Sequence, residues 1–457
     1  MIAGASHSWH TRRMNASLSL TTVQDFRAAL YACFERRADA LFELTDAPLI
    51  ADPVPSPVHL SLTPPHRRGW GSLYAALVHG TINPTAVRAL LAHHPLADGQ
   101  AIYAVDVSIW TRCDAETSPE RGFYYHPSRH SAGQPIVAGW AYQWIAQLSF
   151  ARESWTAPLD VRRVHPSENT NAVAAAQVQA MVARLSPDAP VPIFVFDAGY
   201  DPVQLQQAVA GSRVAIVVRL RANRCFYAAP PPPKETGRPP RHGRKFDCSD
   251  PATWPDPTDE QVCDDDQYGT VRVRAWAGLH PKVQAHAGRG TRGPAPIVPG
   301  TLVLVEVSRL PGRTRDPQVL WLWWHGPDAP DLRVIWRASV RRFDLEHTFR
   351  FLKQTLGWTT PRVRHPAQAD RWTWLILAAY TQLRLARTAV ADRRLPWERS
   401  YAAERLTPCR VRRGVAALLL TLGTPAVPPK PCGRSPGRPK GRRSGHAPRA
   451  PVLKKAA

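Results

Sequence analysis

The sequence predicts an α/β fold, and the clearest evidence is a strand–helix–strand pattern. Residues 191–196 form a continuous apolar run, which is typical of a strand buried on both faces of a parallel sheet. The run ends at Asp197. After a short turn, Asp201 and Pro202 supply the cap and the first residue of a helix, and a second apolar run follows at residues 214–218. Asp197 is therefore expected at the carboxyl end of a strand, where open α/β sheets place their sites.

A second strand is predicted at residues 103–110, and it carries a single acid. Asp106 lies between apolar residues on both sides. A lone charge in an apolar strand is costly unless another group pairs with it. Asp106 is therefore a second candidate for a functional carboxylate.

Residues 341–356 predict an amphipathic helix. Its apolar stripe has helical spacing and consists of Leu345, Phe349, Leu352 and Leu356. The adjoining stripe holds one acid among three cations, namely Arg342, Glu346, Arg350 and Lys353. A charged stripe is commonly a solvated surface. The same pattern also suits a phosphate backbone lying across a metal-binding acid.

The overall charge favours a nucleic-acid partner. The 457 residues include 59 Lys and Arg against 36 Asp and Glu, a net charge of +23 with a pI near 10.4. Double-stranded DNA is a better explanation of this balance than a membrane surface. The seven cysteines form no Cys-x-x-Cys pair, and no segment resembles a signal peptide or a membrane span. We expect a reduced, cytoplasmic, chromosome-associated protein.

The N-terminal region predicts helices. Residues 23–34 carry apolar side chains on one helical face, and residues 72–78 and 84–91 predict two short helices, the second capped by Asn83. Two short helices joined by a Gly-containing turn are one form of a DNA-reading helix-turn-helix. Plain helical packing is the more common alternative.

Two basic, Pro-rich regions interrupt this pattern. Residues 221–330 shift to a β-rich composition, with strands expected at 268–276, 301–307 and 319–324. Residues 424–457 contain nine Lys or Arg and no acid, which predicts a disordered basic tail.

Each of these regions contains a Gly-Arg-Pro triplet, at residues 237–239 and 437–439. The triplets resemble the core of AT-hook segments, in which Arg enters a narrow minor groove. Arg238 and Arg438 are therefore candidate DNA-binding residues.

The three acids together resemble a known family. Asp106 in a first strand, Asp197 in an Asp-x-Gly-Tyr turn and Glu346 on a distant helix are similar to the DDE motif of bacterial insertion-sequence transposases. Within that family, the helix resembles the group with a Tyr-Arg-Glu-Lys signature, because Arg342, Glu346 and Lys353 have the same separations. Ser339 occupies the Tyr position.

The resemblance implies an RNase H-like catalytic core with a β-rich insertion, a helical N-terminal region and a disordered basic C-terminal tail. The expected regions are 1–100 (helical, with possible DNA binding), 101–220 (first part of the core), 221–330 (insertion), 331–390 (acid-bearing and following helices) and 391–457 (last helix and tail). Strands followed by helix, strand, helix and strand agree with this fold.

The resemblance also implies two-metal phosphoryl transfer. Asp106, Asp197 and Glu346 would hold two Mg²⁺ or Mn²⁺ ions, which prefer hard carboxylate oxygens. The expected DNA-binding residues are Arg342, Arg350, Lys353, Trp323, Arg238 and Arg438. In the resembled group a Trp of the insertion stacks on an unpaired base, although alternating aromatics on a strand are more often packing.

The resulting hypothesis is a transposase that acts, as a homodimer on DNA, on transposon ends and target DNA, with no membrane partner. Two alternatives stay open: an RNase H-like nuclease without strand transfer, and a non-catalytic basic DNA-binding protein. Inverted repeats flanking the gene would favour the transposase.

Overall fold

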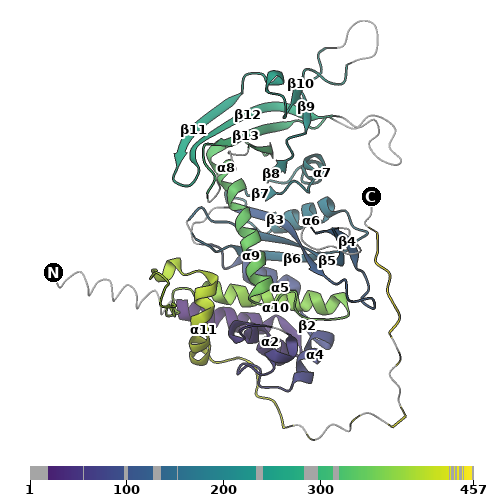
Figure 1. The fold of residues 1–457 in the computed structure, drawn as a ribbon, viewed down its shortest axis with the longest axis vertical. Coiled ribbons are helices and arrows are strands. Elements are labelled where there is room, and N and C mark those ends of the chain that lie inside the picture. The colour runs from purple at the N-terminus through teal and green to yellow at the C-terminus, as the bar shows by residue number, and fades with distance from the viewer. Residues whose placement is uncertain are drawn as a thin grey trace, which may run out of the picture. The chain divides into compact units, whose positions relative to one another are not determined.

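In the computed structural model (Figure 1), the chain forms two compact units. Unit 1 comprises Met1–Ala97, Val107–Glu168 and Asp344–Ala457, and unit 2 comprises Asp98–Asp106 and Asn169–Phe343. The residues that the structure describes are 19–54, 56–96, 101–126, 135–151, 153–232, 240–282, 297–311, 319–431, 433, 437, 440–441, 445 and 447–454. The architecture is mixed α/β, with a large mixed sheet, as the sequence predicted.

Unit 1 contains an antiparallel arrangement of strands around β5 (Ile136–Gln147). β4 (Gly122–Tyr125) and β6 (Ala157–Val164) both pair antiparallel with β5, which also neighbours β3 (Ile102–Thr111). A Cβ on Gly139 would lie 2.3 Å from the backbone oxygen of Trp110, so the close approach of β5 and β3 requires glycine here. β5 therefore contains a glycine close to its start.

β6 is a strand that the sequence analysis did not predict. Its Asp160 is buried and forms an ion pair with Arg88. The strand was missed because Pro158 and three charged residues hide its apolar pattern.

Helices complete unit 1. They are residues 19–32, α2 (Ala38–Ile50), α3 (Pro57–Leu60), α4 (Trp70–His79), α5 (Pro84–Ala92), α9 (Phe343–Gln354, whose first residue counts with unit 2), α10 (Pro366–Leu385), η2 (Ala403–Arg405) and α11 (Pro408–Leu422). β1 (Phe34–Arg36) and β2 (Thr81–Ile82) form a small antiparallel pair. The predicted helices at residues 72–78 and 84–91 are confirmed as α4 and α5.

α10 is the buried helix of unit 1. It packs against α2, α4, α11 and β6, and 15 of its 20 residues are buried. No helix in the described part of the chain, α10 included, is long and apolar enough to cross a membrane.

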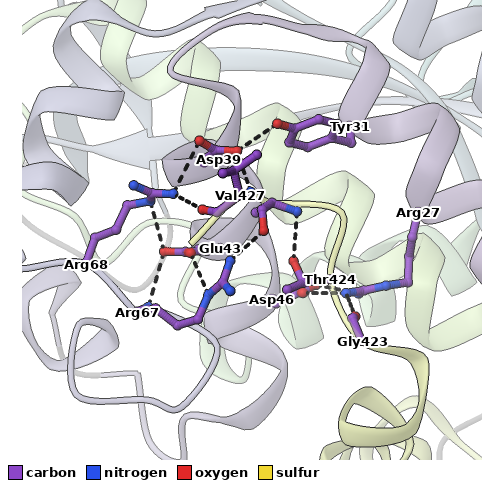
Figure 2. A network of polar contacts seen from close by, with 11 residues as sticks. Arg27, Tyr31, Asp39, Glu43, Asp46, Arg67, Arg68, Gly423, Thr424 and Val427 are labelled. Carbon is purple, nitrogen blue, oxygen red and sulfur yellow. Dashed lines mark hydrogen bonds and ion pairs between the residues drawn. The ribbon is translucent and has the colours of Figure 1, made fainter. Parts of the chain in front are cut away.

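Arg27 forms a buried ion pair between the N-terminal helices and also a hydrogen bond to the end of α11 (Figure 2). Arg27 donates to both carboxylate oxygens of Asp46 at 2.8 Å, and both residues are only 3% exposed. Arg27 also donates to Gln382 on α10 at 2.5 Å and to the carbonyl oxygen of Gly423 at 2.8 Å. The first and last helical regions of the chain therefore share one buried polar cluster.

The start of the basic tail is bonded to residues on α2 and in the segment before α4. Arg67 donates to the carbonyl oxygen of Ala426 at 2.7 Å, and Arg68 donates to that of Val427. The Val427 amide in turn donates to Asp39 at 2.9 Å. The expectation of a wholly disordered tail is therefore wrong for these residues, because buried and half-buried groups of unit 1 satisfy their backbone.

A second part of the tail also has partners in unit 1. The Ala450 amide donates to the carbonyl oxygen of Glu116, and the Leu453 amide to that of Arg121, both at 2.7 Å. Leu453 forms a parallel bridge with Gly122 of β4. The tail segment thus follows the edge of β4, where free backbone groups accept an added strand.

Unit 2 is built on a mixed sheet. Its path runs β10-β9-β12-β13-β14-β8-β7-β3, and β11 pairs with β12. The elements are β7 (Ile193–Phe196), β8 (Ala215–Leu220), β9 (Cys225–Tyr227), β10 (Lys245–Asp247), β11 (Asp259–Asp265), β12 (Gly269–Pro281), β13 (Gly300–Val307), β14 (Leu320–His325), α6 (Thr170–Val182), α7 (Pro202–Ala208), η1 (Pro251–Thr253) and α8 (Leu332–Arg341). The strand pairs β3–β7 and β7–β8 are parallel. The pairs β8–β14, β14–β13, β13–β12 and β12–β11 are antiparallel.

The strands expected between residues 221 and 330 are confirmed as β12, β13 and β14 (Figure 1). Aromatic side chains of this region pack on one another with ring centroids 5.0–5.9 Å apart. The cluster consists of Phe246 of β10, Trp254 after η1, Trp276 of β12 and Trp321 of β14. Large aromatic rings bury much apolar area in such contacts. They give this β-rich region a core of its own.

The Arg27–Asp46 pair makes a stability prediction. Arg27→Ala should destabilise the protein by about 3–5 kcal/mol, because Asp46 would remain buried without its cation. The double variant Arg27→Met/Asp46→Leu should recover most of that loss, since neither charge remains. Arg162→Ala, which breaks the far more exposed pair with Glu168 in the same unit, should cost less than about 1 kcal/mol. Denaturant unfolding measures all three, and equal losses for Arg27→Ala and Arg162→Ala would contradict the prediction.

Candidate active site

The parallel pairing of β3 and β7 brings Asp106 and Asp197 together. Val105 of β3 is in register with Phe196 of β7, and each acid is the next residue of its chain. Neighbouring strands lie about 4.8 Å apart, and residues in register on them point to the same face. The two acids that the sequence singled out therefore lie side by side in unit 2.

The turn after β7 holds Asp197 in place. Its Oδ1 accepts the Gly199 amide at 2.9 Å, and Asp201 caps α7 by accepting the amides of Val203 and Gln204 at 2.9 and 3.0 Å. The cap that the sequence predicted is thus confirmed. A short, internally bonded turn keeps the acid at the strand end rather than in a mobile loop.

Arg342 is the cationic partner of Asp106. Its Nη1 donates to Asp106 Oδ2 at 2.7 Å, and the two side chains are 9% and 14% exposed. The sequence placed Arg342 on the charged stripe of one continuous helix. In the structure α8 ends at Arg341 and α9 begins at Phe343, so Arg342 lies at the junction and turns toward the sheet.

Tyr200 is a site residue to which sequence reasoning gave no role, although it ends the Asp-x-Gly-Tyr turn. Its ring is 5% exposed and packs edge-on against Phe196. Burial, followed by the charges of Asp106 and Asp197, raises the pKa of Tyr200 well above its ordinary value, although Arg342 opposes this. The protonated hydroxyl has no hydrogen-bond partner among the described residues. A buried, unsatisfied hydroxyl beside two acids marks a place where a further polar group fits.

The remaining signature residues lie on α9. Glu346 and Arg350 are exposed, whereas Lys353 is half-buried and its Nζ lies 5.6 Å from the ring centroid of the buried Trp358. The predicted apolar stripe of this helix is confirmed, since all four of its members are buried. Ser339, in the signature Tyr position, donates to the carbonyl oxygen of Ile335 within α8.

The donor set suits a hard metal ion. Asp106 and Asp197 offer carboxylate oxygens, which Mg²⁺ and Mn²⁺ prefer, next to the unsatisfied Tyr200 hydroxyl. Glu346 belongs to unit 1. Among the described residues, no group of three or more His, Cys, Asp or Glu side chains is placed to hold a metal. The structure therefore assembles two of the three predicted ligands within one unit.

The predicted stacking residue occupies a different environment. Trp323 has no exposed surface, stacks on Phe226 at 5.3 Å and donates to Gln206 at 3.1 Å. Because Phe226 and other buried neighbours cover its ring, Trp323 cannot stack on a DNA base in this structure, and its prediction as a DNA-binding residue is wrong. Arg238 and Arg438, the two triplet arginines, lie outside the described residues.

The helices α4 and α5 are the segment for which DNA reading and plain helical packing were both considered. Arg88, the one cation in the sequence of α5, pairs with the buried Asp160 and lies 5.1 Å from the ring centroid of Trp374. α5 packs on β6. These contacts use Arg88 within unit 1, and DNA binding by this segment stays a prediction.

Comparison with known families gives one match. A family model described as a DDE superfamily endonuclease matches residues 29–282, which is more than half of the chain. The matched segment contains Asp106 and Asp197 and ends before Glu346. A search of curated proteins gave no match.

The ion pair in the site makes a second prediction. Arg342→Ala should lower the free energy of unfolding by about 3 kcal/mol, because Asp106 would keep its charge in a largely buried position without a partner. Arg342→Ala/Asp106→Asn should regain at least half of the loss. Arg350→Ala, an exposed arginine on the next helix, should change stability by less than about 0.5 kcal/mol. If the double variant is no more stable than Arg342→Ala, the pair does not carry this energy.

Proposed function

The chain belongs to the DDE superfamily endonucleases, and from this premise we propose that it is a transposase. It would cut the ends of an insertion sequence and join them to target DNA. The observation that carries the proposal is the in-register placement of Asp106, within β3, and Asp197, the residue that follows the neighbouring parallel strand β7. The net charge of +23 supports double-stranded DNA as the substrate.

The element order supports an RNase H-like core. The strands β3 to β6 are followed along the chain by α6, β7, α7 and β8. This is the sequence of strands, helix, strand, helix and strand that such a core requires. The insertion β9–β14 then separates β8 from the helix that bears Glu346.

Asp106, Asp197 and Glu346 are proposed to hold the two divalent ions. When bound, Mg²⁺ or Mn²⁺ at these carboxylates would activate the attacking oxygen and stabilise the leaving oxygen of an in-line displacement at phosphorus. The nucleophile would be water in cleavage and the freed 3′-hydroxyl in joining. No side chain of the protein is then required as a nucleophile.

The cations of the signature are proposed to have separate tasks. Arg342 holds the carboxylate of Asp106 in a fixed orientation through the 2.7 Å hydrogen bond. Arg350 is exposed and Lys353 half-exposed on α9, the helix of Glu346, so we assign them to the phosphates beside the cut. Arg238 and Arg438 remain proposed minor-groove contacts on their triplets alone.

The acid pair weighs against a non-catalytic DNA-binding protein. Two carboxylates at adjacent positions repel each other, and negative charge at this place would weaken the binding of phosphate by a protein that only binds DNA.

A nuclease without strand transfer differs from a transposase only in the second chemical step. The two enzymes are separated by incubating the purified protein and Mg²⁺ with DNA that carries the ends of its own element. Joined products support a transposase, and cleavage without joining supports a nuclease. Action as a homodimer on DNA is part of the same proposal.

Loss of any one acid should abolish cutting. Asp106→Asn, Asp197→Asn and Glu346→Gln should each lower the cleavage rate by more than about a hundredfold, because one ligand is lost while the fold is kept. Asp114→Asn is the control, since Asp114 is an exposed acid on the turn after β3. Cleavage is followed on end-labelled DNA, and binding is measured in parallel. Near-parent cutting by one of the three variants would remove that residue from the site.

Lys353 tests the assignment of the signature. Lys353→Met keeps the apolar stem against Trp358 but removes the charge, so it should cut specific ends at least tenfold more slowly with little change in thermal stability. Lys353→Arg should cut nearly as well as the parent. Binding to random DNA should fall much less than cutting. If Lys353→Met cuts like the parent, Lys353 serves only to cover Trp358.

A further inference from the structure

The last described segment of the chain lies along the edge of β4 as an added strand. β4 ends the path of strands in the described sheet. Leu453 forms a parallel bridge with Gly122, the first residue of β4. The Leu453 amide donates to the carbonyl oxygen of Arg121, and the Ala450 amide donates to that of Glu116, both at 2.7 Å. The edge of β4 and the turn before it therefore bind the tail through its backbone.

The Arg121 side chain takes part in this binding. It is buried, and its three nitrogens donate to four carbonyl oxygens. Nε donates to Ser118 at 2.9 Å, and Nη1 donates to Arg112 at 3.1 Å. Nη2 donates to Glu116 at 3.3 Å and to Ala450 of the tail at 2.9 Å. The carbonyl oxygen of the tail thus completes the bonding of a buried guanidinium, whose donors are costly to leave without acceptors.

The turn that carries Arg121 is also fixed by contacts that do not involve the tail. Ser118 is buried, and its amide donates to the carbonyl oxygen of Ala115 at 2.9 Å. The indole of Trp140 on β5 donates to the carbonyl oxygen of Pro119 at 3.0 Å. A binding surface that is ordered beforehand loses little conformational entropy when a peptide docks. Only the incoming strand has to be ordered.

β4 has an exposed apolar face beside this edge. Phe123 and Tyr125 are 46% and 71% exposed, and Ile136, which is in register with Tyr125 on β5, is 41% exposed. β4 itself is the uncharged run Gly122–Tyr125. An uncharged edge strand with exposed aromatic side chains is a template for pairing with another chain unless its edge is covered. The tail segment covers the start of this edge.

We propose that the edge of β4 is a peptide-binding site, that its occupant is the segment 450–453 of the same chain, and that this segment prevents the edge from pairing with a second copy. The site takes an extended peptide in parallel orientation and recognises its backbone. It uses the carbonyl oxygen of Ala450 and the amides of Ala450 and Leu453. This property is separate from the chemistry proposed at Asp106 and Asp197.

The other attachment of the tail favours docking within one chain. Ala426 and Val427 are bonded to α2 and to the segment before α4 (Figure 2). The connection from there to Ala450 makes the docking intramolecular, with an effective concentration on the order of 1 mM. A few backbone hydrogen bonds then suffice to fill the site. The same segment of a second copy competes only when the protein concentration approaches that value.

Peptide binding tests the site. A labelled peptide of residues 447–457 is titrated, without DNA, against the full-length protein and against protein that lacks these residues. It should bind the truncated protein at least tenfold more tightly, because the site of the full-length protein is filled. Protein that lacks only residues 454–457 keeps the contacts and should match the full-length protein. A Leu453→Pro peptide, which lacks the amide donor to Arg121, should bind at least fivefold more weakly than the unmodified peptide, and a Leu453→Ala peptide should bind more tightly than the proline variant.

Sedimentation without DNA tests the shielding of the edge. Protein that lacks residues 447–457 should shift toward dimers and larger species at concentrations where the full-length protein does not, and excess peptide should reverse the shift. Full-length Leu453→Pro should shift in the same direction, which keeps the test independent of any folding defect of the truncated protein. Protein that lacks only residues 454–457 should match the parent.

Cross-linking identifies the occupant. Arg449 and Glu116 form an ion pair of 3.0 Å between two exposed side chains, so Arg449→Cys/Glu116→Cys is treated with a short reagent that joins two thiols. The single variant Arg449→Cys is the control for links to the exposed thiols of Cys113 and Cys409. A link within one chain supports the proposal, whereas a link between chains shows that the strand comes from a second copy and overturns it.

Two further results would contradict the proposal. Equal binding of the peptide by the truncated and the full-length proteins would show that segment 450–453 does not fill the site. Unchanged sedimentation of both the truncated protein and Leu453→Pro would show that the segment does not shield the edge.

Discussion

The parallel register of β3 and β7 is the constraint on which the candidate site depends. Side chains alternate between the faces of a strand, so a slip of one residue in either strand would send Asp106 and Asp197 to opposite faces. The register is fixed by burial: Phe194, Val195 and Phe196 are each at most 1% exposed. The apolar run before Asp197 therefore does more than form a strand, because it also sets the position of the acid.

Placing two carboxylates side by side creates a repulsion that the rest of unit 2 must offset. Arg342 forms an ion pair with one of the acids, Asp106, and it reaches that acid because the helical segment breaks between α8 and α9. Tyr200 adds a neutral hydroxyl, since burial and the same two acids disfavour its anion. With Arg342 beside the two acids, this part of the sheet presents charges of both signs, which suits a ligand that brings phosphate and metal ions together.

Unit 1 has a different basis. Its N-terminal helices, β4 to β6 and the helices from α9 to α11 come from separated parts of the chain, and α10 is the surface against which they pack. Arg27, which is paired with Asp46, joins the first of these parts to the last through its hydrogen bonds to Gln382 and Gly423 (Figure 2). The tail leaves α11 along the same helices and meets β4 near its end, so it is tied to unit 1 at two places. Held in this way, the basic segment stays close to unit 1. A free tail would sample a larger volume and would have a lower effective concentration there.

By itself the sequence determined the local features: the strand ending at Asp197, the capped helix after it, the apolar stripe of α9 and the strands of the insertion. Each of these follows from the spacing of apolar residues and from short-range caps and turns, which act over a few neighbours in the chain. The sequence also named both acids of the pair, because a charge in an apolar strand is conspicuous. Only the tertiary structure decided that Arg342 bonds Asp106, that Trp323 is buried and that Arg88 pairs with Asp160 inside unit 1. Those facts depend on strand register and on packing between residues far apart in the chain, and no local pattern encodes such distances.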